Sequence, residues 1–419
     1  MSPRPDAARS SPLRVCLFTD TLGDVNGVSR FIRTIAEESE RQRAALHVIT
    51  STRFSCPDRP DVHNVKPVYS RPMPGYATLD VVVPSARAMC MVADRLRPDV
   101  VHVSTPGPVG SVGRRYALKR GLPLVGTYHT DFPAYISHLF NDDALTWICD
   151  RAMRRFYAPF ARVFSRSNDY AHALQRLGVE PGRIDRLLPG IDTGTFSTRY
   201  RDVSGRVWQG VDGVRASSTK VLYVGRVSVE KYLPLLTRVW MRARTLIAAR
   251  GGDAQLIIIG DGPYRAAMSE QLALHDAVFA GFRHGVELST LYASSDLFVF
   301  PSTTDTLGQV VMEAQSAGLP VIVTDQGGPS EVVDNRVTGF VLPASGVGAE
   351  SRWAETIANL VLDPLLRQRM GQAGAAKIAP MSIRHSFEHF WHVHERVRDE
   401  SQAQMDHSEK TARAHEPRE

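Results

Sequence analysis

The chain has few cysteines and no long hydrophobic run. Among its 419 residues there are four cysteines, with no C-x-x-C pair and no paired Cys and His spacing. Zinc sites and disulfide frameworks need such spacings, so the sequence argues against both, and we expect a reducing, cytoplasmic environment. No apolar stretch approaches the ~18–20 residues of a membrane-spanning helix, and the first residues contain no apolar signal region. We therefore expect neither a membrane span nor secretion.

The sequence also lacks compositional bias, a repeat of fixed period and any low-complexity block. With 43% hydrophobic and 22% charged residues it resembles an ordinary globular protein. This composition excludes collagen-like, coiled-coil and wholly disordered chains. At about 100–200 residues per domain, the length predicts two or three domains.

The net charge of +6 is concentrated in the first half of the chain. Residues 1–195 contain 26 basic and 19 acidic side chains, whereas residues 196–419 contain 24 and 25. Acidic partners of the first half include phosphates, anionic lipid and nucleic acid. No nucleic-acid recognition motif accompanies the charge, so we expect no nucleic-acid partner.

Short apolar segments alternate with longer segments of helical periodicity. Several of them, such as VLYVG, LIIIG and LFVFP, are apolar on both faces, as in strands buried between two helix layers. The alternation predicts an α/β protein with two doubly wound, Rossmann-like parallel sheets. The expected strands are 14–18, 47–50, 100–103, 124–128 and 163–165 in the first series, and 220–224, 255–259, 278–280, 297–300, 321–323 and 340–341 in the second.

The two series of strands predict two domains, over 13–198 and 220–381. Residues 199–219 between them are rich in glycine, serine and charge, which indicates a linker. Residues 382–398 have aromatic residues at helical spacing, which predicts a terminal helix that packs back on the N-terminal domain. Residues 399–419 lack apolar periodicity, so we expect a disordered tail.

Two features of the first half follow strands, where open α/β sheets bind ligands. Gly27 lies in a loop that enters a helix, so backbone N–H groups there can approach a phosphate. An ordinary strand–helix turn explains this glycine equally well. His129 follows an apolar strand at its carboxyl end, and it is either a site residue or a structural histidine.

The second half contains two denser clusters. Gly225, Arg226 and Lys231 follow a strand, and the two cations can converge on one diphosphate. Two solvated surface cations are the alternative interpretation. Further along, Asp305 precedes a helix beside free N–H groups, and Glu313 lies inside that helix. Carboxylates and N–H groups in one loop suit a sugar, and the N–H groups also suit a phosphate.

In this order the motifs resemble those of the family 4 glycosyltransferases, which are retaining enzymes of the GT-B fold. The resemblance covers residues 13–397. Its motifs are G-R-x4-K at 225–231, G-D-G-P at 260–263, S-D-x-F-V-x-P-S at 295–302, an acidic residue and Glu eight apart at Asp305 and Glu313, and G-G-x-x-E at 327–331, with N-G-V at 26–28 and P-G-I-D at 189–192.

The resemblance implies two domains that face each other across a cleft and a UDP- or GDP-linked sugar as donor. It implies two catalytic residues: His129, which contacts the transferring sugar, and Asp305, which binds its hydroxyls. The implied donor-binding residues are Gly27 at the phosphates, Arg226 and Lys231 at the diphosphate, the backbone of Thr306, Leu307 and Gly308 at the sugar, and Glu313 at the ribose.

Two details bear on the chemistry that the resemblance implies. The first acid of the motif is usually Glu in this family, and Asp305 is one methylene shorter. No D-x-D occurs in the chain, which agrees with an enzyme that needs neither a metal ion nor a cofactor. Arg226, Lys231 and helix N-termini would then stabilise the negative charge on the leaving group.

The acceptor is predicted from the first half. The segments 102–108 and 128–131 resemble members that transfer mannose or sulfoquinovose to diacylglycerol-type lipids. A stretch with Arg151, Arg154, Arg155, Arg162 and Arg166 among aromatic residues predicts a helix that rests on anionic lipid; a solvated helix face is the alternative. We expect a hexosyltransferase peripheral to the inner face of the cytoplasmic membrane.

Other functions stay open at this point. The acceptor can be a polysaccharide or another carbohydrate instead of a lipid. A nucleotide-sugar epimerase and a non-catalytic partner protein can share the GT-B architecture. The sequence does not distinguish uracil from guanine in the donor.

Overall fold

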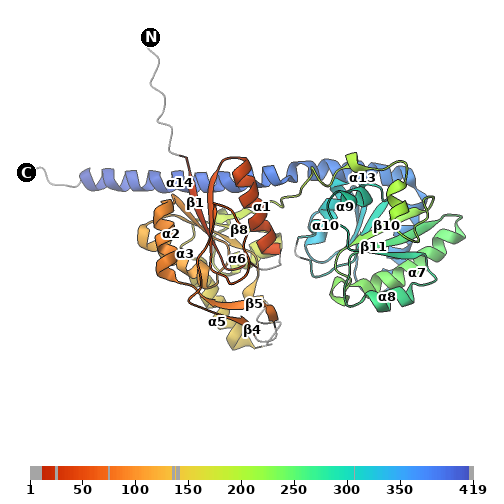
Figure 1. The fold of residues 1–419 in the computed structure, drawn as a ribbon, viewed down its shortest axis with the longest axis horizontal. Helices are drawn as coiled ribbons and strands as arrows, with labels where there is room; N and C mark the ends of the chain where they lie inside the picture. Colours follow the sequence, from red (N-terminus) through yellow and green to blue (C-terminus); the bar gives the residue numbers. More distant parts are fainter. Residues whose placement is uncertain are drawn as a thin grey trace, which may run out of the picture. The chain divides into compact units, whose positions relative to one another are not determined.

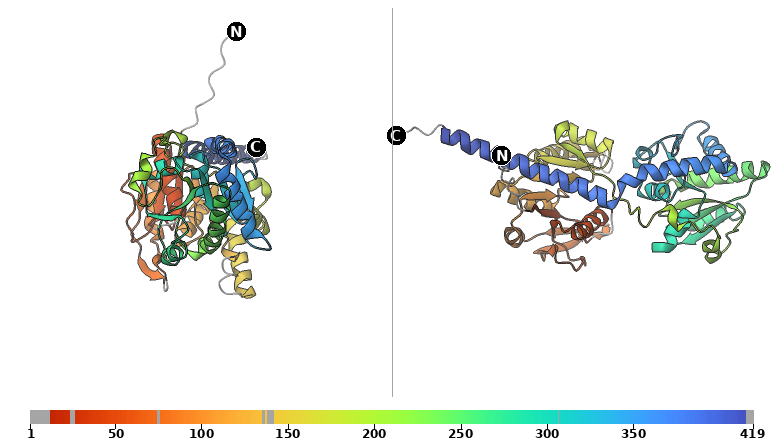
Figure 2. Two further views of the ribbon diagram at one scale, coloured as in Figure 1. Left: turned by 90° about the vertical axis from the view of Figure 1, so that its right-hand side faces the viewer. Right: turned by 90° about the horizontal axis from the view of Figure 1, so that it is seen from above.

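The computed structural model describes residues 12–23, 27–73, 76–134, 137, 142–305 and 307–414, without the side chains at 72–73, 76–81 and 408–414. The chain forms two compact units (Figures 1 and 2). The first unit runs to Gly190 and takes up the chain again from Arg384, and the second unit is Ile191–Ile383. The division therefore falls at Gly190 and not at the expected residue 198.

The first unit is built on a parallel sheet of seven strands in the order β3-β2-β1-β6-β7-β8-β9. The order reverses beside β1, which pairs with both β2 and β6. A separate antiparallel hairpin, β4 and β5, precedes α2. The strands are β1 Arg14–Thr19, β2 Ala45–Thr50, β3 Val62–Asn64, β4 Tyr69–Met73, β5 Tyr76–Val83, β6 Val100–Val103, β7 Leu124–Tyr128, β8 Arg162–Ser165 and β9 Ile184–Arg186.

Helices cover both faces of this sheet. Ile32 and Ile35 of α1 share one core with Phe387 and Phe390 of α14, and α2, α3, α5 and α6 contribute to the other core. Both faces of the central strands are therefore buried, which explains their continuous apolar sequences. The helices are α1 Gly27–Arg41, α2 Ala86–Leu96, α3 Pro108–Arg120, α5 Asp143–Tyr157, α6 Asn168–Arg176 and α14 Ile383–Ala414.

A buried pair of histidines joins α14 to the first sheet. His102 on β6 and His394 on α14 lie with Nδ1 and Nε2 3.0 Å apart. His394 Nδ1 lies 2.7 Å from the Phe390 carbonyl, so it donates there and its Nε2 accepts from His102. The Thr127 hydroxyl then donates to His102 Nε2 over 3.0 Å. Burial lowers the pKa of His102 well below its usual range and that of His394 to about 4.

The second unit is built on a parallel sheet of six strands in the order β12-β11-β10-β13-β14-β15. Here the order reverses beside β10, which pairs with β11 and β13. The strands are β10 Thr219–Val224, β11 Ala254–Ile259, β12 Ala277–Gly281, β13 Leu297–Phe300, β14 Val321–Thr324 and β15 Gly339–Leu342. The helices are α7 Leu233–Ala249, α8 Arg265–Gln271, α9 Gly285–Ala293, α10 Gln309–Ser316, α11 Gly328–Glu331, α12 Ala349–Leu362 and α13 Pro364–Ile378.

The predicted linker over 199–219 is wrong, because this segment packs into the second unit. Trp208 and Val211 are buried in its core. Arg215 forms ion pairs with Asp253 at 2.7 Å and Asp276 at 2.6 Å. The glycine, serine and charge that suggested a linker belong to turns around these anchors.

The predicted disordered tail from residue 399 is also wrong, because α14 continues to Ala414. Glu400 lies in this continuation and pairs with Arg162 at 3.0 Å. Figure 1 shows α14 in blue lying along the first unit. Over the described residues, no helix combines the length and the apolar content that crossing a membrane requires.

The buried histidine pair predicts that stability falls in mild acid. The unfolded chain binds a proton at each histidine below about pH 6.5, whereas folded His394 resists protonation down to about pH 4. The free energy of unfolding of the first unit should therefore drop as pH falls from about 6.5 to 4, with His394 contributing about 3 kcal/mol. Denaturant titrations across this pH range measure the drop.

Two variants on α14 separate the buried pair from other titrating groups. His394→Gln removes the buried imidazole. It should make the free energy of unfolding depend less steeply on pH, and it should lower stability at pH 8. His392→Gln removes an exposed histidine on the same helix, whose side chain is 70% exposed, and should leave the dependence unchanged. An equal slope in wild type and His394→Gln would contradict the assignment.

Candidate active site

In the second unit, predicted site residues gather where the strand order reverses. Ligands of open α/β sheets bind beyond the carboxyl ends of strands at such a point. The loop after β10 contains Gly225 and Arg226, and the loop after β13 contains Asp305. Because β10 and β13 are hydrogen-bonded neighbours, the two loops leave the same edge of the sheet.

The loops after β10 and β11 pack backbone against backbone. A Cβ atom at Gly260, where φ is +129°, would come within 2.1 Å of the Gly225 carbonyl oxygen. The Gly225 N–H donates to the Ile259 carbonyl over 3.0 Å, and the Tyr223 hydroxyl donates to the Arg226 carbonyl over 2.9 Å. The G-D-G-P motif therefore supports the loop of Arg226 through close backbone approach.

Lys231 and Asp305 form an ion pair at the carboxyl edge of the sheet. Lys231 ends the short helix η4 (Val229–Lys231), and its Nζ lies 3.0 Å from Asp305 Oδ2. Both side chains are about four-fifths buried. The same ammonium lies 5.9 Å from the centre of the Phe300 ring. An ammonium has three N–H donors, so this pair leaves donors for a ligand.

The Asp305 carboxylate also closes the turn that begins α10. Its Oδ1 accepts the N–H of Gly308 over 2.8 Å and of Leu307 over 3.3 Å. Burial opposes its ionisation, but the Lys231 ammonium and these two N–H groups outweigh burial and hold the pKa of Asp305 below its usual range. Asp305 is therefore an anion that bridges two loops. Thr306, predicted beside it, lies outside the described residues.

Glu313 lies on α10 and is 5% exposed. The Tyr292 hydroxyl donates to its Oε2 over 3.3 Å, and the Tyr292 ring packs edge-on against Phe196 at 5.4 Å. A carboxylate held in this way presents acceptor oxygens in a fixed position, which suits a pair of vicinal hydroxyls.

Arg226 differs from Lys231, because it faces solvent. Its side chain is 63% exposed and its guanidinium lies 3.4 Å from Glu230. An exposed cation whose ion pair lies at the surface is able to reorient toward an anionic ligand. The structure therefore places Arg226 and Lys231 on one short segment with different surroundings.

In the first unit, Asp20 organises the edge where that sheet reverses. Its carboxylate accepts the Thr105 hydroxyl over 2.7 Å and the N–H of Val109 over 2.7 Å, and so caps α3. Gly27 begins α1 and is exposed, and a Cβ atom there would meet no atom within 4 Å. Asn26, the residue before it in the N-G-V motif, lies outside the described residues.

His129 follows β7 at the carboxyl edge of the first sheet. Its Nε2 lies 3.0 Å from Ser104 Oγ, and its ring packs edge-on against Phe31 with 5.8 Å between centres. Its Nδ1 is buried and has no hydrogen-bond partner among the described residues. Burial and, next, the Arg166 charge lower the pKa of His129 well below its usual range. The imidazole is therefore neutral at pH 7.

Arg166 lies after a strand and not on the predicted basic helix. It was predicted on a basic helix, but it directly follows β8, with its guanidinium 5.2 Å from the centre of the Phe31 ring. Burial lowers the pKa of Arg166 to about 10, so it remains charged at pH 7. Its position after a strand, like that of His129, was the signal that could have identified it.

The remaining cations of the predicted lipid-binding helix also divide into two groups. α5 ends at Tyr157, so Arg162 lies outside it, on β8, where it pairs with Glu400. Arg151, Arg154 and Arg155 do lie on α5 and are exposed. The basic helix is therefore shorter than predicted.

Comparison with known proteins identifies the fold. A glycosyltransferase structure from Rickettsia africae matches with a TM-score of 0.69, at 15% identity over 92% of this chain and 99% of that one. HepE from Anabaena, solved with UDP, matches with a TM-score of 0.71, at 17% identity over 91% and 99%. The chain thus has the GT-B fold.

Sequence comparison identifies the family. The model described as Glycosyltransferase Family 4 matches residues 25–195, and the model described as Glycosyl transferases group 1 matches residues 208–377. A GDP-mannose-dependent alpha-mannosyltransferase of Mycobacterium tuberculosis is 33% identical over 87% of this chain and 92% of its own length. A sulfoquinovosyl transferase of Arabidopsis thaliana is 28% identical over 79% and 64%. The chain belongs to the family 4 glycosyltransferases, and the predicted family resemblance is confirmed.

The turn at Gly308 supports a stability prediction. Gly308 has φ of +68°, and a Cβ atom there would come within 2.9 Å of the Pro329 Cα. Gly308→Ala should lower the free energy of unfolding of the second unit by about 1–3 kcal/mol through left-handed strain and this backbone contact. Gly210→Ala is the matched control, because a Cβ atom at Gly210 meets nothing within 4 Å. Equal denaturation midpoints for the two variants would contradict the role of the turn.

Proposed function

We propose that the enzyme transfers mannose, with retention of configuration, from GDP-mannose to a hydroxyl of a membrane glycolipid or glycerolipid. The relatives that use GDP-mannose support the donor, including the Mycobacterium tuberculosis protein at 33% identity. The name of another relative, an alpha-monoglucosyldiacylglycerol synthase of Streptococcus pneumoniae that is 24% identical over 78% of this chain and 74% of its own length, supports the acceptor class.

The observation on which the donor proposal rests is the Lys231–Asp305 pair at the switch point of the second sheet. In the proposed complex, the donor diphosphate takes the free donors of Lys231 and the guanidinium of Arg226. Asp305 accepts a hydroxyl of the donor sugar beside the backbone of Thr306, Leu307 and Gly308, and Glu313 accepts the ribose hydroxyls. These cations neutralise the diphosphate, and the proposed reaction uses no metal ion or other cofactor.

The proposed reaction exchanges one bond to the anomeric carbon for another. The acceptor hydroxyl oxygen forms the new bond on the face from which the bond to the β-phosphate oxygen breaks. The electron pair of the broken bond stays on the nucleoside diphosphate, and the hydroxyl proton passes to that phosphate oxygen. Positive side chains matter most at this stage, because negative charge develops on the leaving group.

His129 keeps the role that the family resemblance implies, a hydrogen bond to a hydroxyl of the transferring sugar. The structure supports this role through the state of the ring. A neutral imidazole that shares Nε2 with Ser104 holds a fixed orientation and adds no charge beside the sugar. Gly27, which is exposed at the start of α1, keeps its proposed place at the phosphates.

An exposed apolar surface on α5 supports membrane association. Leu145, Trp147 and Ile148 have 44%, 61% and 56% of their surface exposed. The Arg151 guanidinium lies 5.1 Å from the centre of the Trp147 ring. Aromatic and aliphatic side chains with arginine beside them are typical of helices that lie in the headgroup region of anionic membranes. We propose that this surface rests on the inner face of the cytoplasmic membrane.

The donor proposal predicts selective binding of GDP. In titration calorimetry, GDP should bind more tightly than UDP, and Arg226→Ala should weaken GDP binding about 10- to 100-fold because a charge-assisted contact to phosphate is lost. Arg242→Ala is the control, since Arg242 is similarly exposed, at 57%, but lies on α7 and pairs with Glu350. Tighter binding of UDP, or equal loss in both variants, would reject the proposal.

The membrane proposal predicts binding to anionic vesicles. The double variant Trp147→Ser and Ile148→Ser should reduce co-sedimentation with phosphatidylglycerol vesicles at least ~10-fold, because apolar burial in the headgroup region is lost. Leu274→Ser in the second unit, at a residue 93% exposed, should have no effect. Wild-type protein that stays in the supernatant would rule out this surface as a membrane contact.

A further inference from the structure

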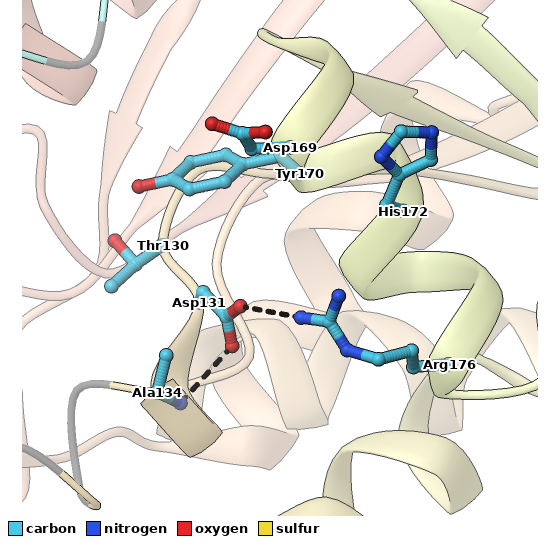
Figure 3. A pocket seen from close by; sticks show the side chains of 7 residues that line it. All are labelled: Thr130, Asp131, Ala134, Asp169, Tyr170, His172 and Arg176. Atoms are coloured by element: carbon cyan, nitrogen blue, oxygen red, sulfur yellow. Dashed lines mark hydrogen bonds and ion pairs between the residues drawn. The ribbon is translucent and has the colours of Figure 1, made fainter. Parts of the chain in front are cut away.

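The first unit contains an open pocket of about 490 Å³ between the loop after β7 and helix α6. This volume lies within the ~300–1,000 Å³ range of ligand pockets. The site residues described above do not line it. Figure 3 shows its polar lining, which consists of Thr130, Asp131, Asp169, Tyr170, His172 and Arg176.

Asp131 gives the pocket a fixed wall. Its carboxylate accepts the Tyr128 hydroxyl over 3.0 Å. It also accepts the Ala134 N–H over 3.2 Å, and Arg176 lies 3.5 Å away (Figure 3). Its side chain is 16% exposed. Tyr170 is also held, because its ring packs edge-on against Tyr128 with 5.7 Å between centres. Neither the Asp131 carboxylate nor the Tyr170 ring needs to move to contact a ligand.

Other side chains of the pocket offer hydrogen-bonding groups to a ligand. The side chains of Asp169 and His172 are exposed, and Thr130 is half-buried. Arg176 makes one long ion pair, and its side chain is 68% exposed. Hydrogen-bond donors and hydrogen-bond acceptors therefore both line the pocket, beside the Tyr170 ring.

The charges of the pocket limit the ligand. Asp131 and Asp169 contribute two negative charges and Arg176 one positive charge. A phosphate would meet two carboxylates at close range, which is unfavourable. Sugar hydroxyls suit the same groups, because they donate to carboxylates and accept from a guanidinium, and a sugar ring packs on tyrosine.

We propose that this pocket binds a sugar ring without phosphate, the glycosyl headgroup of the acceptor. This inference rests on the proposed function and makes it more specific. Thr130 and Asp131 directly follow His129, so the loop that contains the proposed catalytic histidine also forms the wall of the pocket. A sugar ring bound in the pocket contacts the same loop that contains His129. The acceptor is therefore a glycosylated lipid in preference to plain diacylglycerol.

Direct binding tests the pocket without a donor. Saturation-transfer NMR should detect methyl α-D-glucopyranoside or methyl α-D-mannopyranoside on wild-type protein, and glucose 6-phosphate more weakly. Asp169→Asn and Arg176→Gln should each weaken glycoside binding about 10-fold, the effect of one lost hydrogen bond to a charged group. Gln175→Ala, an exposed neighbour on α6 outside the pocket lining, should leave binding unchanged.

Transfer from GDP-mannose supplies the second measurement. With monoglucosyldiacylglycerol as acceptor, Asp169→Asn and Arg176→Gln should raise the acceptor KM about 10-fold and leave donor affinity and donor hydrolysis unchanged. With plain diacylglycerol, the variants and wild type should be equal. Both substituted residues are exposed, so folding should be retained.

The two measurements fail differently. Tighter binding of glucose 6-phosphate than of the methyl glycosides, or variants that bind glycosides as wild type does, would overturn the pocket assignment. Glycoside binding that follows the predicted pattern, together with no transfer from GDP-mannose to any lipid, would overturn the proposed function and support the pocket.

Discussion

The parallel pairing of strands is the constraint on which the rest of this structure depends. In a parallel sheet all carboxyl ends lie along one edge, and the strand order reverses at β1 and β6 in the first unit and at β10 and β13 in the second. Loops diverge at these points and leave room for a ligand. Asp20, Asp305 and Lys231 all lie at these edges, although the chain separates them widely.

Charge compensation shapes the second of these edges. A largely buried ammonium and carboxylate are each costly alone, and together they are acceptable when hydrogen bonds satisfy the remaining groups. Asp305 meets this condition, because backbone N–H groups of Leu307 and Gly308 complete its carboxylate, whereas Lys231 keeps donors for a ligand. The pair also gives a structural role to an aspartate at a position where the family usually has a glutamate. The shorter side chain reaches its own turn and Lys231 together.

The first unit divides its polar and apolar chemistry between neighbouring segments. The loop after β7 and helix α6 present carboxylates, hydroxyls and a guanidinium around one pocket, whereas α5 between them in sequence exposes Trp147 and Ile148. The lipid acceptor proposed above has the same division, with a polar headgroup and an apolar body. The correspondence follows from chain order, since α5 connects β7 to β8 and α6 follows β8 directly.

The sequence determined the architecture and the order of the motifs, because buried parallel strands are continuous apolar runs that are visible without a structure. It did not reveal β3, β9 or the β4–β5 hairpin, since two are three-residue edge strands and the hairpin stands apart from the sheet. Trp208 and Val211 anchor their segment without periodicity, so that segment read as a linker. The helix beyond Asp399 extends an existing helix, which needs no new nucleation and hence no apolar pattern. Only the tertiary structure joined Arg166 to His129, and Arg176 to Asp131, because these contacts depend on the neighbouring positions of β7 and β8 and not on spacing along the chain.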